Sequence, residues 1–277
     1  VVNLVPRSGG NTFSGQAFYN TAGEWSSGDN LNDFLRGIGI TERGGVINAY
    51  DGSASLGGPI LRDRIWFFGG YRKVVTAQGV EGIFGNANAL DPTRWDYRRD
   101  DTVSVRDVQG RTIYQGRFTG QVTPTNRVAF SQENQYRCQG STVTPGGDGC
   151  RERGSDWLAM GSTTLSPEAS DRYFDFPYWL TQATWTSTAT SRLLFEAGFS
   201  RLAYPGGAGT GSPDGGRMLI QVREQSAIDG HPANFGYRGI DTTGASYQNI
   251  KNWRASASYV TGAHNLKVGY QGGYQRG

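Results

Sequence analysis

Hydrophobic and polar side chains alternate along most of this chain with a period of two, which is the pattern of β-strands that have one apolar and one polar face. In residues 111–122, for example, Tyr114 and Phe118 fall on one face, whereas Arg117 and Thr119 fall on the other. The sequence therefore predicts an all-β fold. We place nine strands at about 12–20, 48–60, 65–76, 111–122, 128–137, 178–187, 192–203, 250–260 and 265–276.

The connections between these strands alternate strictly in length. The short ones lie at 61–64, 123–127, 188–191 and 261–264. The long ones lie at about 21–47, 77–110, 138–177 and 204–249, and are rich in Gly, Asp, Asn, Ser, Thr and Pro. In an antiparallel meander this alternation puts every long loop at the same end of the strands. Outer-membrane β-barrels have this arrangement, with short periplasmic turns and long extracellular loops. The pattern therefore predicts a segment of an antiparallel transmembrane β-barrel.

Aromatic residues stand close to several predicted connections. Trp66, Phe67 and Phe68 directly follow a charged short turn, Arg62-Asp63-Arg64. Aromatic side chains favour the membrane–water interface, so we predict that these three rings belong to an aromatic girdle. Further girdle residues are predicted at Tyr178, Trp185, Trp253 and Tyr259. The alternative is a soluble β-sandwich with these rings in its core, but that fold gives no reason for all long loops to share one end.

Composition supports a β-rich protein with little aliphatic core. Gly occupies 42 of 277 positions, against a typical ~7%, and such a density disfavours helices; aromatic residues make up 12% of the chain. The formal net charge is +3, with both signs interspersed. A nucleic-acid binder needs a basic stripe, so we expect no nucleic-acid partner.

The sequence carries no obvious targeting segment or membrane helix. No apolar run approaches the ~20 residues of a membrane helix, and the first residues do not resemble a signal peptide. There is no initial Met, and residues 275–277 continue a predicted strand. We therefore expect the chain to be a piece of a longer protein.

Three stretches carry a family resemblance. The sequence VVNLVPRSGGNTFSGQAFY (1–19) resembles the plug-to-barrel junction of TonB-dependent outer-membrane receptors. The sequence DGSASLGGPILRDRIWFFGGYR (51–72) resembles the next hairpin in their Oar-like, carboxypeptidase-regulatory-like branch. The sequence SYVTGAHNLKVGYQGGY (258–274) resembles a later hairpin. The three stretches occur in the order expected for the family.

The resemblance implies a 22-stranded barrel that is filled by its own N-terminal plug domain and powered through the TonB complex. On this basis residues 1–10 are the end of the plug, and residues 11–277 are the N-terminal part of the barrel. The implied location is the outer membrane of a Gram-negative cell, with the barrel surrounded by lipid and the long loops extracellular. The sequence departs from the family pattern because it has no TonB box and no main plug body, and nine strands are an odd number.

Candidate site residues fall in two groups. The long loops mix rings and charges, as binding surfaces often do, although ordinary loop decoration would look the same. The candidate ligand contacts are Arg94, Trp95, Tyr97, Arg98, Arg99, Tyr173, Phe174 and Asp175. Charged residues of the polar face could line the lumen or contact the plug, or simply form a solvated wall. These are Arg117, Glu133, Arg137, Glu196, Arg254 and Lys267.

The two cysteines, Cys138 and Cys150, flank a loop rich in Gly, Ser and Thr, and we expect them to form a disulfide in an oxidising compartment. We expect no metal site, because segments 29–33 and 145–149 offer oxygen ligands without EF-hand spacing. No catalytic motif or cofactor motif is present, so we expect neither an enzyme nor a cofactor.

Three functional hypotheses remain. The first is a piece of a TonB-dependent receptor that transports a bulky ligand not identified by the sequence. The second is a passive porin or an adhesion-type outer-membrane barrel. The third is a secreted, soluble glycan-binding β-domain. A plug and TonB box distinguish the first from the second, and partition into detergent distinguishes both from the third.

Overall fold

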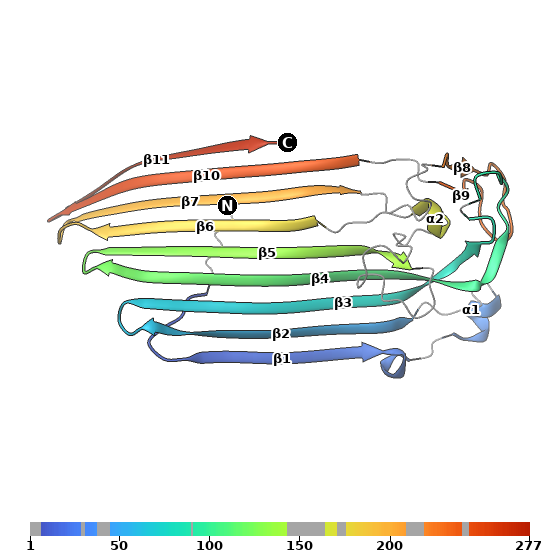
Figure 1. Cartoon of the computed structure of the whole chain (residues 1–277), viewed down its shortest axis with the longest axis horizontal. Coiled ribbons are helices and arrows are strands. Elements are labelled where there is room, and N and C mark those ends of the chain that lie inside the picture. The colour runs from blue at the N-terminus through green and yellow to red at the C-terminus, as the bar shows by residue number, and fades with distance from the viewer. Residues whose placement is uncertain are drawn as a thin grey trace.

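The computed structural model contains one large antiparallel sheet with a smaller cluster of loops at one end (Figure 1). It describes residues 7–28, 31–37, 45–89, 91–142, 164–170, 176–208, 219–239 and 244–277. Within this part of the chain, no helix is long and apolar enough to cross a membrane.

Nine strands form the large sheet, and each is hydrogen-bonded to the next large strand along the chain. They are β1 (Ser14–Gly23), β2 (Val46–Leu61), β3 (Ile65–Asn86), β4 (Arg99–Thr123), β5 (Asn126–Thr142), β6 (Phe176–Thr188), β7 (Leu193–Ala208), β10 (Gly244–Thr261) and β11 (His264–Arg276). All their pairings are antiparallel. The predicted all-β fold and its nine long strands are confirmed.

Short elements complete the described part of the chain. A 3-10 turn, η1 (Glu24–Ser26), and helix α1 (Asp33–Gly37) lie between β1 and β2. Helix α2 (Pro167–Ser170) precedes β6, and the small ladder of β8 (Val222–Arg223) with β9 (Gly236–Tyr237) lies between β7 and β10. The period-two pattern did not predict these elements, because each is too short to show a period.

Strands β3 and β4 extend well beyond their predicted ends. Their pairing continues through Thr76 and Gln109 to Asn86 and Arg99, so much of the predicted loop 77–110 is a two-stranded ribbon. The register is irregular between Gly79 and Gly85. These glycines interrupt the side-chain alternation, while the backbone can still form its ladder.

Cross-strand partners share a face of the sheet, so the register assigns each residue to one face. We call the two faces the apolar face and the polar face. One row on the apolar face contains Phe67, Phe118, Phe130, Phe199 and Trp253. The adjacent row on the polar face contains Phe68, Arg117, Ser131, Gln182, Ser200 and Asn252.

The three rings after the charged turn do not share one face, so they cannot all belong to one aromatic girdle, and a girdle position of Phe67 stays a prediction. Phe67 lies opposite Phe118 on the apolar face. Trp66 and Phe68 instead lie opposite Thr119 and Arg117 on the polar face. Successive side chains of a strand point to opposite faces, so three consecutive rings cannot share one girdle.

The segment before β1 is fastened to the turn between β2 and β3. The Asn11 Oδ1 atom accepts hydrogen bonds from the Asp63 backbone N–H at 2.9 Å and from Trp66 Nε1 at 2.7 Å. Asp63 has a φ of 63°, a left-handed conformation that asparagine and aspartate tolerate better than most residues. A Cβ atom on Gly9 would lie 2.1 Å from the Phe67 carbonyl oxygen. The segment therefore crosses the hairpin at a distance that only glycine permits.

We expect Gly9→Ala to displace residues 7–13 from the hairpin, because its Cβ would collide with backbone atoms of Phe67 and Gly58. The cost should be about 1–3 kcal/mol, as for other overpacking substitutions. Gly10→Ala is the matched control, since no atom lies within 4 Å of its Cβ position. Hydrogen exchange of the Asp63 amide should accelerate in Gly9→Ala alone. Equal exchange in the two variants would contradict the predicted contact.

Candidate functional site

The polar face contains a hollow of about 720 Å³ over strands β4 to β7, β10 and β11. Its polar lining comes from Arg117, Ser131, Gln182, Asn252, Arg254 and Gln271. These residue types offer hydrogen-bond donors and acceptors together with two positive charges. The hollow is therefore suited to a polar or anionic group.

Small residues in the strands make room for long polar side chains over this face. A Cβ on Gly198 would lie 3.0 Å from Arg254 Nε, and a Cβ on Gly70 would lie 2.6 Å from Gln115 Nε2. These side chains therefore lie across the glycines. Arg117 Nε donates to Thr119 Oγ1 at 3.4 Å, and Thr119 is only 3% exposed.

The structure puts the predicted lumen-facing residues on the polar face. Arg117 and Arg254 both line the hollow, and Lys267 forms an ion pair with Glu196 at 2.8 Å. Glu133 lies farther along β5, where its Oε1 accepts a 2.5 Å hydrogen bond from Gln135. The backbone register also puts Arg137 on this face, but its side chain lies outside the described residues. Their predicted contact with a plug or substrate stays a prediction.

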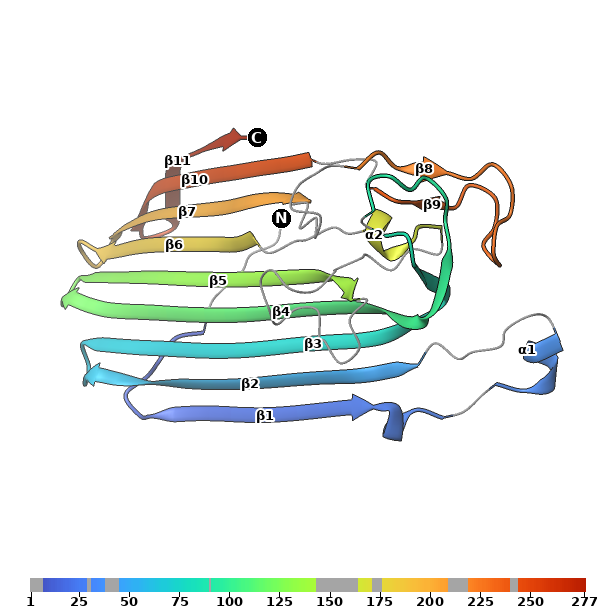
Figure 2. The same cartoon turned by 45° about the vertical axis from the view of Figure 1, so that its right-hand side comes forward.

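A second assembly lies at the long-loop end of the sheet, where β8, β9 and α2 pack beside the β3–β4 ribbon (Figure 2). We call residues 83–102, 164–170 and 219–239 the outer-loop cluster. Its apolar core consists of Ile83, Tyr97, Phe235 and Tyr237, against which Val222 and Ile228 pack. The cluster brings together three of the predicted long loops.

Arg238 joins two parts of this cluster. Its guanidinium donates to the carbonyl oxygens of Pro92, Arg94 and Ile220 at 2.8, 2.8 and 3.1 Å. It also stacks over the Trp95 ring, 3.7 Å from the ring centre. Arg238 is 7% exposed and has a φ of 75°, an uncommon conformation for a bulky residue. Several contacts therefore hold a strained backbone position in place.

Glu168 in α2 lies next to the backbone of Arg238 and is 5% exposed. Its Oε1 accepts hydrogen bonds from Asn86 Nδ2 at 2.7 Å and from the Arg238 backbone N–H at 3.1 Å. Burial raises the pKa of the Glu168 carboxyl, although these hydrogen bonds oppose the shift. The buried carboxyl thus joins α2 to the β3–β4 ribbon and to the residue that follows β9.

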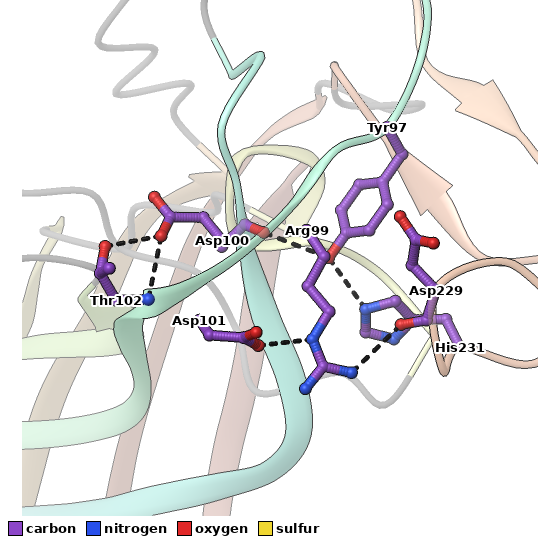
Figure 3. A network of polar contacts seen from close by, with 8 residues as sticks. Tyr97, Arg99, Asp100, Asp101, Thr102, Asp229 and His231 are labelled. Carbon is purple, nitrogen blue, oxygen red and sulfur yellow. Dashed lines mark hydrogen bonds and ion pairs between the residues drawn. The ribbon is translucent and has the colours of Figure 1, made fainter.

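His231 forms the centre of a second network (Figure 3). Its ring stacks on Phe235 with 3.7 Å between ring centres, and its Nε2 lies 2.9 Å from the Tyr97 hydroxyl. That hydroxyl donates to the Gly85 carbonyl at 3.1 Å, which assigns the hydrogen between the rings to His231 Nε2. His231 Nδ1 is then a buried acceptor without a hydrogen-bond partner in the described part of the chain.

Charged groups surround this histidine. Arg99 lies over the Phe84 ring. Its Nε forms a 2.5 Å ion pair with Asp101 (Figure 3). Its NH1 group donates to the Asp229 carbonyl at 3.3 Å. Burial lowers the pKa of His231, Arg99 lowers it further, and Asp229 opposes both. The imidazole is therefore neutral at pH 7 and acts as part of the core.

We expect backbone amides of the outer-loop cluster to lose protection against hydrogen exchange at mildly acidic pH, because protonation of His231 destabilises the cluster. Its folded pKa lies below the ordinary value of 6.5, so the unfolded cluster binds more protons between these two values. The stability is therefore complete above about pH 6.5 and falls as the pH drops toward the folded pKa. Hydrogen exchange of the Gly236 amide, which donates to the Thr164 carbonyl at 2.9 Å, measures the effect at pH 7.5 and 5.0 after correction for intrinsic rates.

The matched variant for this prediction is His231→Phe, which keeps the stack on Phe235 and removes the titrating ring. Because Glu168 has a raised pKa, its own contribution has the opposite sign and is common to both proteins. The wild-type protein should thus lose more protection on acidification than the variant. Identical pH dependence in the two proteins would refute a role for His231.

The predicted loop contacts have different positions in the structure. Arg94 and Arg98 are exposed, and Trp95 is 54% exposed. Tyr97 is only 5% exposed because it packs in the apolar core, so little of its side chain is accessible, and its role as a contact residue stays a prediction. Arg99 is partly buried and held by Asp101.

Several predicted residues lie outside the described part of the chain. These are Tyr173, Phe174, Asp175, Cys150 and the side chain of Cys138. The disulfide therefore stays a prediction. Sequence reasoning did not find Glu168, His231 or Arg238 as cluster residues. The one available signal was that each is a polar residue inside a long loop with no period.

Comparison with known proteins gives one partial similarity. Residues of this chain are 30% identical over 142 positions to the TonB-dependent transporter Oar of Myxococcus xanthus. The match covers 47% of this chain and 13% of that transporter, so the chain spans a small part of its relative's length. No protein-family model matches the chain. No solved structure matches it either. The chain thus has a partial relationship to a TonB-dependent transporter, together with an all-β fold.

Proposed function

We propose that this chain is part of a TonB-dependent outer-membrane receptor that moves a bulky ligand across the outer membrane. The observation that carries the proposal is the nine-stranded meander, which has an aromatic row on one face and a polar row on the other. Transmembrane β-barrels alternate lipid-facing and lumen-facing residues in this way. The partial similarity to a TonB-dependent transporter supports the same interpretation.

The ends of the sheet support a membrane orientation. Strand pairs β2–β3, β4–β5, β6–β7 and β10–β11 are joined by short turns, and the outer-loop cluster lies at the opposite end. We therefore assign the short turns to the periplasm and the outer-loop cluster to the cell exterior. Lipid surrounds the apolar face in this arrangement, and the polar face lines the lumen.

In the proposed transport function, residues act by binding the ligand or the plug, and no catalytic step or cofactor is involved. The exposed Arg94, Trp95 and Arg98 of the outer-loop cluster are the proposed first contacts for a ligand. Arg117 and Arg254 in the hollow are the proposed contacts of the plug domain or of a ligand in transit. The plug and the contact with the TonB complex belong to the longer protein.

Labelling of single cysteines in intact cells tests the proposed orientation. Ala233→Cys lies in the outer-loop cluster, Ala189→Cys lies in the turn between β6 and β7, and both positions are exposed. In the full-length protein, a membrane-impermeant maleimide should label Ala233→Cys directly. It should label Ala189→Cys only after the outer membrane is permeabilised. The unsubstituted protein reports labelling of its own cysteines, and equal labelling of both variants in intact cells would refute the orientation.

Dependence on TonB separates the proposed receptor from a passive porin or an adhesion-type barrel. Ligand uptake through the full-length protein should stop when TonB is deleted. Uptake that persists without TonB would identify a passive pore, and recovery of the protein in the secreted soluble fraction would favour a glycan-binding domain.

A further inference from the structure

The apolar face changes character on the long-loop side of its aromatic row. The next row contains Gln132, Thr181, Arg201, Lys251 and Tyr274 as consecutive cross-strand partners. Arg201 lies two residues beyond Phe199 on β7, which is roughly 7 Å farther along the strand. Lipid-facing aromatic residues therefore give way to charged residues over a short distance.

Arg201 and Lys251 are direct cross-strand partners. Such partners have Cβ atoms about 4.5–5.5 Å apart, and like charges in these positions destabilise a sheet. Arg201 Nε donates to Asn249 Oδ1 at 3.2 Å, which leaves most of the guanidinium donors for another acceptor. The protein thus holds two positive charges together on one face, and an anion between them would remove their repulsion.

Charge is sorted by face over the regular part of the sheet, residues 14–23, 46–78, 109–136, 178–204 and 247–276. In these strands, the apolar face carries Lys73, Arg201, Lys251 and Arg276 and no carboxylate. The strand carboxylates Asp51, Glu133 and Glu196 all belong to the polar face. Lys73 is on β3 and Arg276 is on β11, so the four cations are spread across the sheet.

Amphipathic rings accompany these cations. Tyr274 is the cross-strand partner of Lys251 and is 55% exposed, and Trp179 lies on the same face one row beyond Thr181. Lys73 Nζ lies 5.8 Å from the centre of the Tyr50 ring. Aromatic and basic side chains together are characteristic of the headgroup layer of a membrane.

We propose that the Arg201–Lys251 pair binds the phosphate of an anionic lipid headgroup in the outer leaflet, with Lys73 and Arg276 extending the basic surface. The planar guanidinium can hold two phosphate oxygens, and the ammonium adds a point charge. The occupant is a lipid because the pair lies directly beyond the aromatic row on the same face. This inference rests on the proposed membrane location of the apolar face.

The test uses the purified full-length protein in a neutral detergent, with phosphatidylglycerol as the probe. Native mass spectrometry measures the lipid retained as its concentration is raised. The double variant Arg201→Gln/Lys251→Gln should bind phosphatidylglycerol about 30-fold more weakly, since each cation near an anionic headgroup contributes roughly a fivefold gain. The charge-preserving variant Arg201→Lys/Lys251→Arg should retain most of the binding.

The matched control is Arg111→Gln/Arg127→Gln, which removes two exposed positive charges from the polar face, outside the hollow. Its affinity for phosphatidylglycerol should stay within about twofold of the wild-type value. The proposal is overturned if both double variants lose affinity equally or if neither does. It is also overturned if millimolar inorganic phosphate displaces the lipid completely, because the site would then recognise a free anion.

Outer-membrane fractionation of the same variants reports on the proposed function separately. If the wild-type protein does not fractionate with the outer membrane, the receptor proposal fails whatever the lipid affinity is. If the protein is in the outer membrane and the Arg201–Lys251 variant binds the lipid normally, only the headgroup inference fails. Heat-modifiable migration in gels establishes that each variant is folded before its affinity is compared.

Discussion

Replacing Phe199 with arginine is expected to prevent most of the full-length protein from assembling in the outer membrane. Phe199 lies in the aromatic row of the apolar face and is 40% exposed in the isolated sheet. If this face contacts lipid, an arginine there costs up to about 2–4 kcal/mol, which is the value at the bilayer midplane and decreases toward the headgroup layer. Phe118→Arg and Phe195→Arg, on the same face, should have the same effect. Heat-modifiable migration of the membrane fraction measures the folded share.

Ser200→Arg is the matched control, because Ser200 is the next residue on β7 and lines the polar hollow. This variant should assemble almost as well as the wild-type protein. Thr119 also lies on the polar face, but it is 3% exposed, so an arginine there would be crowded and cannot serve as a control. Equal assembly of Phe199→Arg and Ser200→Arg would contradict the assignment of the two faces.

Loss of the Arg238 side chain is expected to open the outer-loop cluster while the sheet stays intact. Arg238→Ala leaves the carbonyl groups of Pro92, Arg94 and Ile220 without their charged donor. It also removes the stack on Trp95. Hydrogen bonds to charged groups contribute about 1.5–3 kcal/mol each and are not additive, so the local cost should be about 3 kcal/mol or more. Limited proteolysis should then cut within residues 219–239 at low protease concentration.

The variant Arg238→Gly distinguishes the effect of losing the side chain from the effect of the strained backbone conformation. The φ of 75° at this position costs an L-residue roughly 1 kcal/mol, and glycine adopts it freely. The glycine variant should therefore be more resistant to protease than the alanine variant and less resistant than the wild-type protein. Arg98→Ala, which truncates an exposed arginine, should behave like the wild-type protein. Cleavage of Arg238→Ala at the wild-type rate would contradict the bracing role of this residue.

The sequence predicted the sheet well because side-chain alternation and turn length are local signals. Strand β11 was placed at 265–276 and is His264–Arg276, and β6 was placed at 178–187 and is Phe176–Thr188. The predicted polar-face residues Arg254 and Lys267 also followed from alternation alone. The β3–β4 ribbon was missed because Gly79 and Gly85 carry no side-chain pattern, although their backbone lies in the ribbon.

The outer-loop cluster could not be predicted, because its contacts join residues that are far apart in sequence. Glu168 meets Arg238 across 70 positions, and Tyr97 meets His231 across 134 positions. No periodic pattern connects such residues. Tyr97 was therefore interpreted as an exposed contact from its charged neighbours, whereas it is the centre of a buried core.

The proposed function requires that the apolar face of the sheet contacts lipid in the full-length protein. Spin labels placed one at a time at positions 194–201 of β7 test it directly, because they sample both faces. Frequent collisions of a spin label with oxygen indicate that the label faces lipid, and frequent collisions with a water-soluble nickel complex indicate that it faces water. We predict that oxygen accessibility peaks at 195, 197 and 199, with nickel accessibility peaking at the positions between them. Uniformly high nickel accessibility at all positions would contradict the claim.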